Sequence, residues 1–350
     1  MEPIRVLIIE DSAFMRKMIS EILESDERIK VVGTARNGED GLKKIKSLSP
    51  DVITLDIEMP VMDGITTLEK IMKADPMPVV MLSSLTSKGA EQTVLAISIG
   101  AVDFITKPSG SISLDIEVMK DEIISKVIMA SQTKVKKNPT VNHQSFQTIS
   151  PQRYSESIVT IGTSTGGPRA LQQVLSYLPV DFPAPILIVQ HMPPNFTKSL
   201  ADRLNTLCQI KVKEAVHGEV IKSGVAYIAP GDYHMKARKV GTSLAIELTK
   251  ELQRNGHRPS VNVLFDSISK LKRINKICVV LTGMGKDGAE GIEQIKLTDK
   301  EAIVIAESEE SSIVYGMPAA AVATECVNQV VHLNKVGETI KRIVNRLGRV

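Results

Sequence analysis

The chain has 350 residues, of which 43% are hydrophobic and 24% are charged, and its formal net charge at pH 7 is +3. This is the composition of an ordinary globular protein, and so small a net charge argues against a nucleic-acid or membrane-surface partner. Aromatic residues make up only 3%, which also disfavours a base-stacking surface. A chain of this length predicts about two or three domains.

The three cysteines, Cys208, Cys278 and Cys326, are scattered and form no C-x-x-C pair, so a zinc site or redox motif is not expected. A sparse and odd number of cysteines suits a reducing compartment. No apolar run approaches the ~18 residues needed to span a membrane, and the first residues lack the basic flank of a signal peptide. We therefore expect a cytoplasmic protein without membrane insertion.

The first part of the chain alternates short apolar runs with amphipathic segments. Residues 13–23 carry apolar side chains at helical spacing, as expected for a helix that packs on a sheet. The alternation predicts βα units and a doubly wound, mainly parallel sheet, which together form a three-layer α/β domain over residues 1–128. The β-branched runs cover residues 5–9, 31–34, 52–55, 79–82 and 104–106.

A polar stretch without hydrophobic periodicity follows at residues 129–156. It is rich in Ser, Gln and Lys and is interrupted by Pro139 and Pro151. Such a composition cannot bury enough apolar surface to fold alone, so we predict a flexible linker.

A second alternating series predicts a second doubly wound α/β domain over residues 157–350. The two halves share this architecture but no sequence repeat. Helices are expected at residues 201–207, 261–271 and 337–347. The apolar runs cover residues 158–161, 185–190, 226–229, 244–248, 277–281 and 302–306.

Polar side chains follow the apolar runs of the first half. Because ligands bind at the carboxyl ends of strands in doubly wound sheets, these side chains are predicted to share one pocket. Three carboxylates repel one another unless a cation lies among them, and hard oxygen ligands suit Mg²⁺. A solvated acidic rim is the alternative, and a lysine in the same pocket disfavours it. The residues are Glu10, Asp11, Asp56, Ser83 and Lys107.

Residues 4–125 resemble the receiver domain of a two-component response regulator. The resemblance implies that Asp56 accepts a phosphoryl group from a histidine kinase. It also implies that Asp11, Asp56 and the backbone carbonyl of Glu58 hold Mg²⁺ with support from Glu10, and that Ser83 and Lys107 sense the phosphate. The motifs that carry it are Glu10-Asp11-Ser12, Asp56-Ile-Glu-Met-Pro-Val-Met-Asp-Gly64, Ser83-Ser84 and Gly100-Ala-Val-Asp-Phe-Ile-Thr-Lys-Pro108.

The stretch Ile161-Gly-Thr-Ser-Thr-Gly-Gly-Pro168 fits either a phosphate-binding loop or a nucleophile turn. A P-loop needs Gly-Lys-Ser/Thr after its spaced glycines, and the dinucleotide motif needs a glycine where Ser164 stands, so both phosphate patterns fail. A strand, a G-x-S-x-G turn and a helix are the context of a nucleophilic serine. We therefore interpret Ser164 as a candidate nucleophile.

A nucleophilic serine needs a base, and the base needs a carboxylate that orients it. Among the six histidines, His191 ends an apolar run and is predicted to lie at the same sheet edge as Ser164. Asp287 follows another run, in a glycine-dense loop whose N–H groups, including that of Met284, can donate to an oxyanion. Asp232 is the rival carboxylate. The pattern favours Asp287 but does not exclude Asp232.

The order Ser, His, Asp differs from the order Ser, Asp, His of α/β-hydrolases. Residues 157–346 instead resemble the catalytic domain of the chemotaxis protein-glutamate methylesterase/glutaminase family. This implies Ser164 as nucleophile, His191 as base and Asp287 as its orienting group, with Thr165 and Met284 beside them. The stretches that carry the resemblance are Ile161–Gly167, Val189-Gln-His-Met-Pro193, Ala229-Pro-Gly-Asp-Tyr-His234, His257-Arg-Pro-Ser260 and Leu281-Thr-Gly-Met-Gly-Lys-Asp-Gly288.

The two resemblances imply a phosphorylation-regulated serine esterase. It would demethylate glutamate methyl esters and deamidate glutamines on methyl-accepting chemotaxis receptors, giving sensory adaptation. Mg²⁺ would serve phosphorylation, hydrolysis would need no cofactor, and the protein would act as a monomer. The rival is a phosphorylation-switched binding protein with an inactive hydrolase scaffold. A DNA-binding regulator is disfavoured, because no basic recognition helix follows the receiver.

Overall fold

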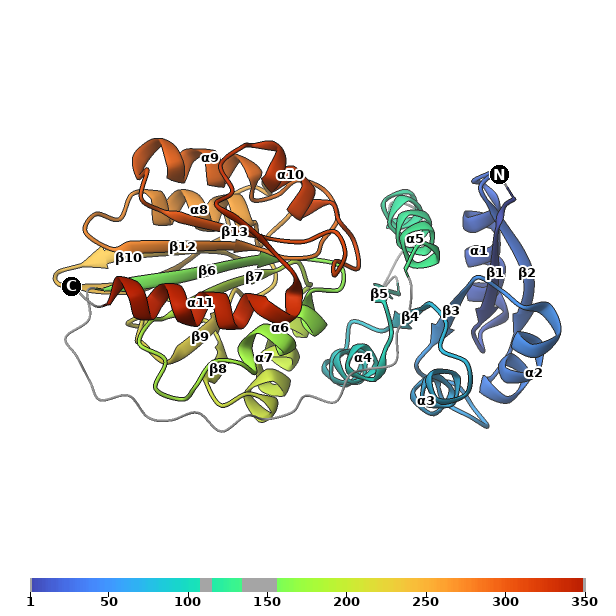
Figure 1. Cartoon of the computed structure of the whole chain (residues 1–350). Coiled ribbons are helices and arrows are strands. Elements are labelled where there is room, and N and C mark those ends of the chain that lie inside the picture. The colour runs from blue at the N-terminus through green and yellow to red at the C-terminus, as the bar shows by residue number, and fades with distance from the viewer. Residues whose placement is uncertain (1, 108–114, 134–155, 349–350) are drawn as a thin grey trace. The chain divides into compact units, whose positions relative to one another are not determined.

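The computed structural model describes residues 2–107, 115–133 and 156–348. Its contacts divide the chain into two units, Met1–His143 and Gln144–Val350, each built on a parallel sheet with helices on both faces (Figure 1). Most of the predicted linker, residues 134–155, lies outside the described residues. The predicted linker covers residues 129–156, and its residues 129–131 belong to helix α5 (Asp115–Ser131).

The first unit is a five-stranded parallel sheet in the order β2-β1-β3-β4-β5. The chain reverses its direction of sheet growth between β1 and β3, and the carboxyl ends of strands at such a switch point form a crevice. The strands are β1 (Ile4–Ile9), β2 (Ile29–Ala35), β3 (Val52–Asp56), β4 (Val79–Ser83) and β5 (Asp103–Thr106). The helices besides α5 are α1 (Ala13–Glu24), α2 (Gly38–Leu48), α3 (Gly64–Ala74) and α4 (Ser87–Ile99).

Local sequence explains these elements. The strands are nearly continuous apolar runs, because helices cover both faces of the sheet, and every residue of β3 and β4 is buried. Side chains of Ser12, Asn37, Asp63 and Thr86 accept hydrogen bonds from backbone N–H groups in the first turns of α1 to α4. Such N-caps satisfy donors that the helix itself leaves unpaired.

The second unit contains a seven-stranded sheet in the order β14-β13-β12-β6-β7-β9-β8, and all its strand pairs are parallel. Its strands are β6 (Ser157–Thr163), β7 (Ile186–Gln190), β8 (Lys211–Glu214), β9 (Val225–Ile228), β12 (Asn275–Val280), β13 (Ile303–Glu307) and β14 (Gln329–Val331). Its helices are α6 (Gly167–Leu175), α7 (Phe196–Leu207), α8 (Val261–Ser269), α9 (Ala289–Thr298), α10 (Met317–Ala323) and α11 (Leu333–Leu347).

The first strand of this unit, β6, is central in the sheet. Strand β7 lies on one side of it and β12 on the other, so the direction of sheet growth reverses between β6 and β12. Helices α6, α7 and α11 cover one face, and α8, α9 and α10 cover the other (Figure 1). None of the helices that the structure describes is long and apolar enough to cross a membrane.

The apolar run at residues 244–248 does not join the parallel sheet. It lies in β11 (Ser243–Thr249), which pairs antiparallel with β10 (His234–Val240) as a separate two-stranded sheet. The two strands are joined through Gly241, whose φ of 58° suits a two-residue hairpin turn. The doubly wound, three-layer α/β architecture expected from the sequence is otherwise confirmed for both units.

Candidate functional site

Ser164 lies in the turn between β6 and α6, at the carboxyl end of the central strand. The turn is closed by a hydrogen bond from the Gly167 N–H to the Ser164 carbonyl, at 2.8 Å. Gly166 has a φ of 77°, a conformation that costs a glycine little. A Cβ on Gly167 would lie 2.0 Å from Oε1 of Gln190, so the turn has no room for a larger residue. Pro168 lies in the first turn of α6, where its missing N–H costs nothing.

His191 directly follows β7, the strand that pairs with β6. Thr163 and Gln190 are register partners, so Ser164 and His191 leave neighbouring strands at the same level. The His191 N–H donates to the Thr163 carbonyl at 3.2 Å. Both groups therefore lie at one sheet edge, as the sequence predicted.

The imidazole of His191 contacts Asp287, with 2.9 Å between Nε2 and Oδ2. Its other nitrogen, Nδ1, is buried and has no hydrogen-bond partner among the described residues. The ring stacks on His257, with centroids 3.9 Å apart. Burial and the neighbouring His191 lower the pKa of His257 to about 4, so that ring is neutral at pH 7.

The Asp287 carboxylate is buried against the N-terminus of α8. Besides His191 it accepts hydrogen bonds from the N–H groups of Val261 and Asn262, at 2.7 and 3.0 Å, and from the Ser260 hydroxyl, at 2.9 Å. Burial favours the neutral acid, but the hydrogen bonds from His191 and these N–H groups outweigh it and lower the pKa of Asp287. Asp287 therefore stays ionised at neutral pH, with its charge beside the His191 ring.

Asp232, the rival carboxylate, lies elsewhere. It forms ion pairs with Arg258 and Lys250, and its side chain is 38% exposed. Its hydrogen bonds go to Arg258, and none to His191 is found in the part of the chain that the structure describes. The contact to His191 thus belongs to Asp287, the carboxylate that the sequence pattern favoured.

Thr165 and Met284 flank the Ser164 turn in different ways. Thr165 is buried, and its carbonyl accepts a hydrogen bond from the Thr282 hydroxyl at 2.9 Å. Met284 is 45% exposed. No hydrogen bond from the Met284 N–H is found within the described residues, so this donor is free to bind an oxyanion.

The sequence assigned no role to three polar residues at this edge of the sheet, which are Gln190, Thr282 and Glu307. Gln190 donates from Nε2 to the Ser164 carbonyl at 2.9 Å, and Glu307 accepts from the Thr282 N–H at 2.8 Å. All three are almost fully buried. Gln190 and Glu307 each end an apolar run, which is the same signal that singled out His191.

In the first unit, carboxylate oxygens of Glu10, Asp11 and Asp56 lie within 4.8 Å of one another. Lys107 Nζ lies 2.9 Å from Glu10 Oε2 and 2.7 Å from Asp56 Oδ1. Burial and the charge of Asp56 raise the pKa of Glu10 to about 7, and burial also raises the pKa of Asp56. The three carboxylates and Lys107 therefore lie close together, as the sequence predicted.

Glu58 and Ser83 also border this acidic cluster. The Glu58 N–H donates to Asp56 Oδ1 at 3.4 Å, and Glu58 and Asp11 line a common pocket of about 430 Å³. The buried Ser83 hydroxyl accepts from Thr93 at 2.7 Å and lies 3.1 Å from the Gly89 carbonyl. Ser83 is therefore coupled to the first turns of α4.

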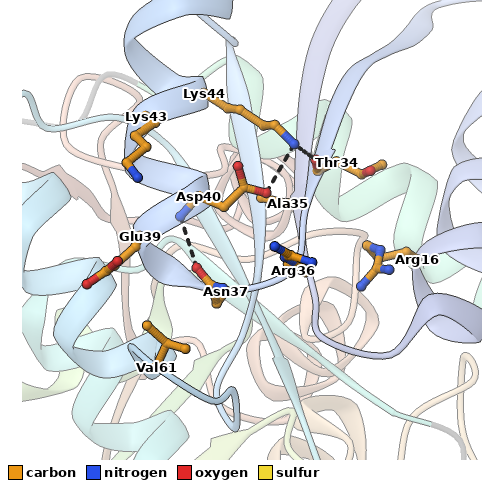
Figure 2. Close-up of a pocket in the computed structure, with 10 residues that line it drawn as sticks. All are labelled: Arg16, Thr34, Ala35, Arg36, Asn37, Glu39, Asp40, Lys43, Lys44 and Val61. Atoms are coloured by element: carbon orange, nitrogen blue, oxygen red, sulfur yellow. Dashed lines mark hydrogen bonds and ion pairs between the residues drawn. The ribbon is translucent and has the colours of Figure 1, made fainter.

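A larger pocket, of about 600 Å³, lies beside α2 and contains several basic side chains (Figure 2). Arg16 forms part of its wall and donates to the carbonyls of Glu10 and Asp11, at 2.6 and 2.7 Å. Lys44 in the same wall pairs with Asp40 at 3.1 Å. The pocket is polar and partly neutralised by its own acidic residues.

Known proteins resemble both units. Residues 159–340 match the family model described as CheB methylesterase, and residues 6–118 match the response regulator receiver domain. A protein-glutamate methylesterase/protein-glutamine glutaminase of Halalkalibacterium halodurans is 56% identical over 344 residues, covering 98% of this chain and 99% of that protein. The Bacillus subtilis protein of the same name is 47% identical over 359 residues, with the same coverage.

Among solved structures, the Thermotoga maritima CheB methylesterase catalytic domain matches with a TM-score of 0.52 and 41% identity. The match covers 54% of this chain and 99% of that domain. The fold and its sites define the class as a response regulator whose receiver unit is joined to an enzyme-like α/β unit. Its relatives match almost the whole chain, and the chain belongs to the CheB methylesterase family. The family inferred from the motifs is confirmed.

Proposed function

We propose that this chain is a receiver-regulated serine hydrolase that acts on methyl-accepting chemotaxis receptors. It demethylates glutamate methyl esters, deamidates glutamines and thereby gives sensory adaptation. The observation that carries the proposal is the contact between His191 and Asp287 at the strand ends beside Ser164. The names of relatives such as the Halalkalibacterium halodurans protein supply the substrate class.

The catalytic cycle follows from these groups. The Ser164 hydroxyl attacks the ester carbonyl while His191 accepts its proton, and Asp287 stabilises the resulting imidazolium. His191 then protonates the leaving methoxide, so methanol departs and an acyl-enzyme remains. Water, deprotonated by His191, releases the glutamate carboxylate and restores Ser164. With glutamine as substrate, ammonia leaves instead of methanol.

We assign the Met284 N–H as the donor that stabilises the oxyanion of the tetrahedral intermediate. This donor is free among the described residues and follows Gly283, where a Cβ would lie only 2.9 Å from the Cβ of Ser164. The Ser164 N–H, by contrast, already donates to the Thr282 carbonyl at 3.1 Å. One such donor contributes about 10²- to 10³-fold to the rate.

The receiver unit is the regulatory part of the proposal, with Asp56 as acceptor of a phosphoryl group from a histidine kinase. The carboxylates of Glu10, Asp11 and Asp56 fit Mg²⁺, which prefers oxygen ligands, and the backbone carbonyl of Glu58 is proposed as a further ligand. Asp56 Oδ2 is buried without a hydrogen-bond partner among the described residues, which supports this fit. When bound, the ion neutralises phosphoryl oxygens.

Lys107 and Ser83 are proposed to sense the phosphorylated state. Lys107 spans Glu10 and Asp56, so a phosphoryl group on Asp56 competes for its ammonium. Ser83 is hydrogen-bonded to Thr93 of α4, so a new contact to phosphate would reorient this helix start. The three cysteines are free, which suits action in the reducing cytoplasm.

Asp56→Asn is expected to abolish the rise in methanol release that a phosphoryl donor causes, because the amide cannot form the acyl phosphate. The unstimulated rate should stay close to that of the wild type. The measurement is methanol release from methylated receptors with and without acetyl phosphate and Mg²⁺. Asp75→Asn, at an exposed aspartate after α3, is the matched control. Full stimulation of Asp56→Asn would rule out this acceptor.

A fragment that begins near Ser155 is expected to hydrolyse methylated receptors faster than the unphosphorylated whole chain. We infer that the receiver unit inhibits the second unit until it is phosphorylated, so its removal raises the rate. Initial rates of the fragment, the whole chain and the phosphorylated chain are compared at equal enzyme concentration. Equal rates for the fragment and the unphosphorylated chain would exclude inhibition by the receiver.

Covalent labelling separates the proposed hydrolase from an inactive binding scaffold. A fluorophosphonate is expected to modify Ser164, because His191, which contacts Asp287, is the proposed base for this hydroxyl. Peptide mass spectrometry identifies the modified residue. A wild-type protein that binds receptors but neither reacts with the reagent nor releases methanol would favour the binding function.

A further inference from the structure

Thr282 follows β12 and joins the loops around Ser164 through its backbone. Its carbonyl accepts hydrogen bonds from the Ser164 N–H at 3.1 Å and from the Thr163 hydroxyl at 2.8 Å. Its own N–H donates to Oε2 of Glu307 at 2.8 Å. Thr282 is almost fully buried, so each of these polar groups depends on its protein partner.

The Thr282 hydroxyl joins two further loops. It lies 2.9 Å from the carbonyl of Thr165, to which it donates, and it accepts from the Val314 N–H at 2.9 Å. One hydroxyl has a single hydrogen and two lone pairs, so it satisfies both partners at once. Thr282 thus holds the backbone on both sides of the Ser164 side chain, through the Ser164 N–H and the Thr165 carbonyl.

The next residue, Gly283, brings this loop into close contact with the serine. Its N–H donates to the Val314 carbonyl at 3.1 Å, and its carbonyl accepts from the Met317 N–H at 2.8 Å. A Cβ here would lie 2.4 Å from the Met317 sulfur and 2.9 Å from the Ser164 Cβ. A shift of Thr282 would therefore move both Ser164 and the adjoining Met284 N–H.

Glu307 is the fully buried carboxylate behind this loop, at the end of β13. Its second oxygen accepts from the Ser311 hydroxyl at 3.0 Å. Burial raises the pKa of Glu307 to about 7, against the hydrogen bonds from Thr282 and Ser311 and the nearby His332. Protonation leaves an acceptor for the Thr282 N–H, so the contact persists in both charge states.

We propose that Thr282 is a positioning residue for Ser164 and that Glu307 in turn fixes Thr282. This inference rests on the proposed function, in which Ser164 is the nucleophile. Neither residue touches the substrate. They act by holding the nucleophile turn and the oxyanion donor in one arrangement, and a misplacement of about 1 Å can cost 10²-fold in rate.

Thr282→Val tests the hydroxyl, because valine keeps the shape but removes the hydrogen bonds that this hydroxyl makes to the Thr165 carbonyl and from the Val314 N–H. We expect kcat for methanol release by the full chain to fall about 10- to 100-fold, with KM for methylated receptors changed less than about 3-fold. Thr282→Ser restores the hydroxyl and should recover most of the loss. Each rate is divided by the number of Ser164 residues that react with a fluorophosphonate, which removes the contribution of misfolded protein.

Glu307 is tested by a matched pair of variants. Glu307→Gln keeps an acceptor for the Thr282 N–H and a donor for the Ser311 hydroxyl, and should retain kcat within about 3-fold. Glu307→Met leaves the Thr282 N–H unpaired and should lower kcat per reactive serine as Thr282→Val does.

The raised pKa of Glu307 in the folded protein also predicts a pH dependence of stability. The free energy of unfolding of the wild type should fall as pH rises from about 5 to 8, and that of Glu307→Gln should fall less.

The outcomes separate this inference from the proposed function. A Thr282→Val protein with wild-type kcat per reactive serine would show that Thr282 is merely structural and would overturn the inference alone. A Thr282→Ser protein as slow as Thr282→Val, or a Glu307→Met protein as fast as Glu307→Gln, would also overturn it. A wild type that neither releases methanol nor reacts at Ser164 would overturn the proposed function and the inference with it.

Discussion

Ser164→Ala is expected to lower kcat for methanol release from methylated receptors by about 10⁴- to 10⁶-fold, because it removes the atom that forms the acyl bond. KM should change little, since alanine is smaller and the substrate still meets the Met284 N–H. The fold should persist, because the Ser164 hydroxyl makes no hydrogen bond among the described residues and the turn is held through its backbone. Methanol is measured from receptors carrying labelled methyl groups.

Ser176→Ala is the matched control for this experiment. Ser176 lies in the same unit, at the end of α6, and its hydroxyl caps the Gln172 carbonyl at 2.7 Å. This variant should keep a rate close to that of the wild type, and both variants should show cooperative thermal unfolding. Near-normal methanol release by Ser164→Ala would show that the assignment of the nucleophile is wrong.

Asp287→Asn is expected to lower kcat by about 10⁴-fold, the loss typical when the orienting carboxylate of such a set becomes an amide. The carboxylate accepts from four donors, on Ser260, Val261, Asn262 and His191. An amide has one acceptor oxygen, so its NH₂ group must face at least one of these donors. An NH₂ group that faces His191 holds the histidine in the wrong tautomer, and in either orientation a backbone N–H loses its acceptor, so the free energy of unfolding should fall by about 1–3 kcal/mol.

Asp232→Asn is the matched control, because Asp232 was the rival carboxylate in the sequence. It pairs with Arg258 and Lys250 and is partly exposed, so its loss should change kcat little and stability by less than about 1 kcal/mol. Steady-state kinetics and urea unfolding are measured on both variants. Equal losses of kcat in the two would contradict the role given to Asp287.

The sequence by itself determined the two α/β units and predicted the candidate members of both sites. Strands buried on both faces appear as continuous apolar runs, which local inspection detects. Parallel strands expose their carboxyl ends at one edge, so a polar residue directly after a run, such as His191 or Asp56, is placed near its partners without knowledge of the fold. Motif order and spacing supplied the family resemblance, which full-length relatives confirm.

Only the tertiary structure decided how those residues are held. The folded chain brings His191 into contact with Asp287 and not with Asp232, because the N-terminus of α8 supplies the N–H groups that keep Asp287 ionised and oriented. It also moved residues 244–248 into a hairpin and revealed Thr282 and Glu307 behind Ser164. The physical reason is that hydrogen bonds such as that between Thr282 and Ser164 join residues distant in sequence. Short-range periodicity reports which residues are buried, but only the folded chain determines which buried donor meets which acceptor.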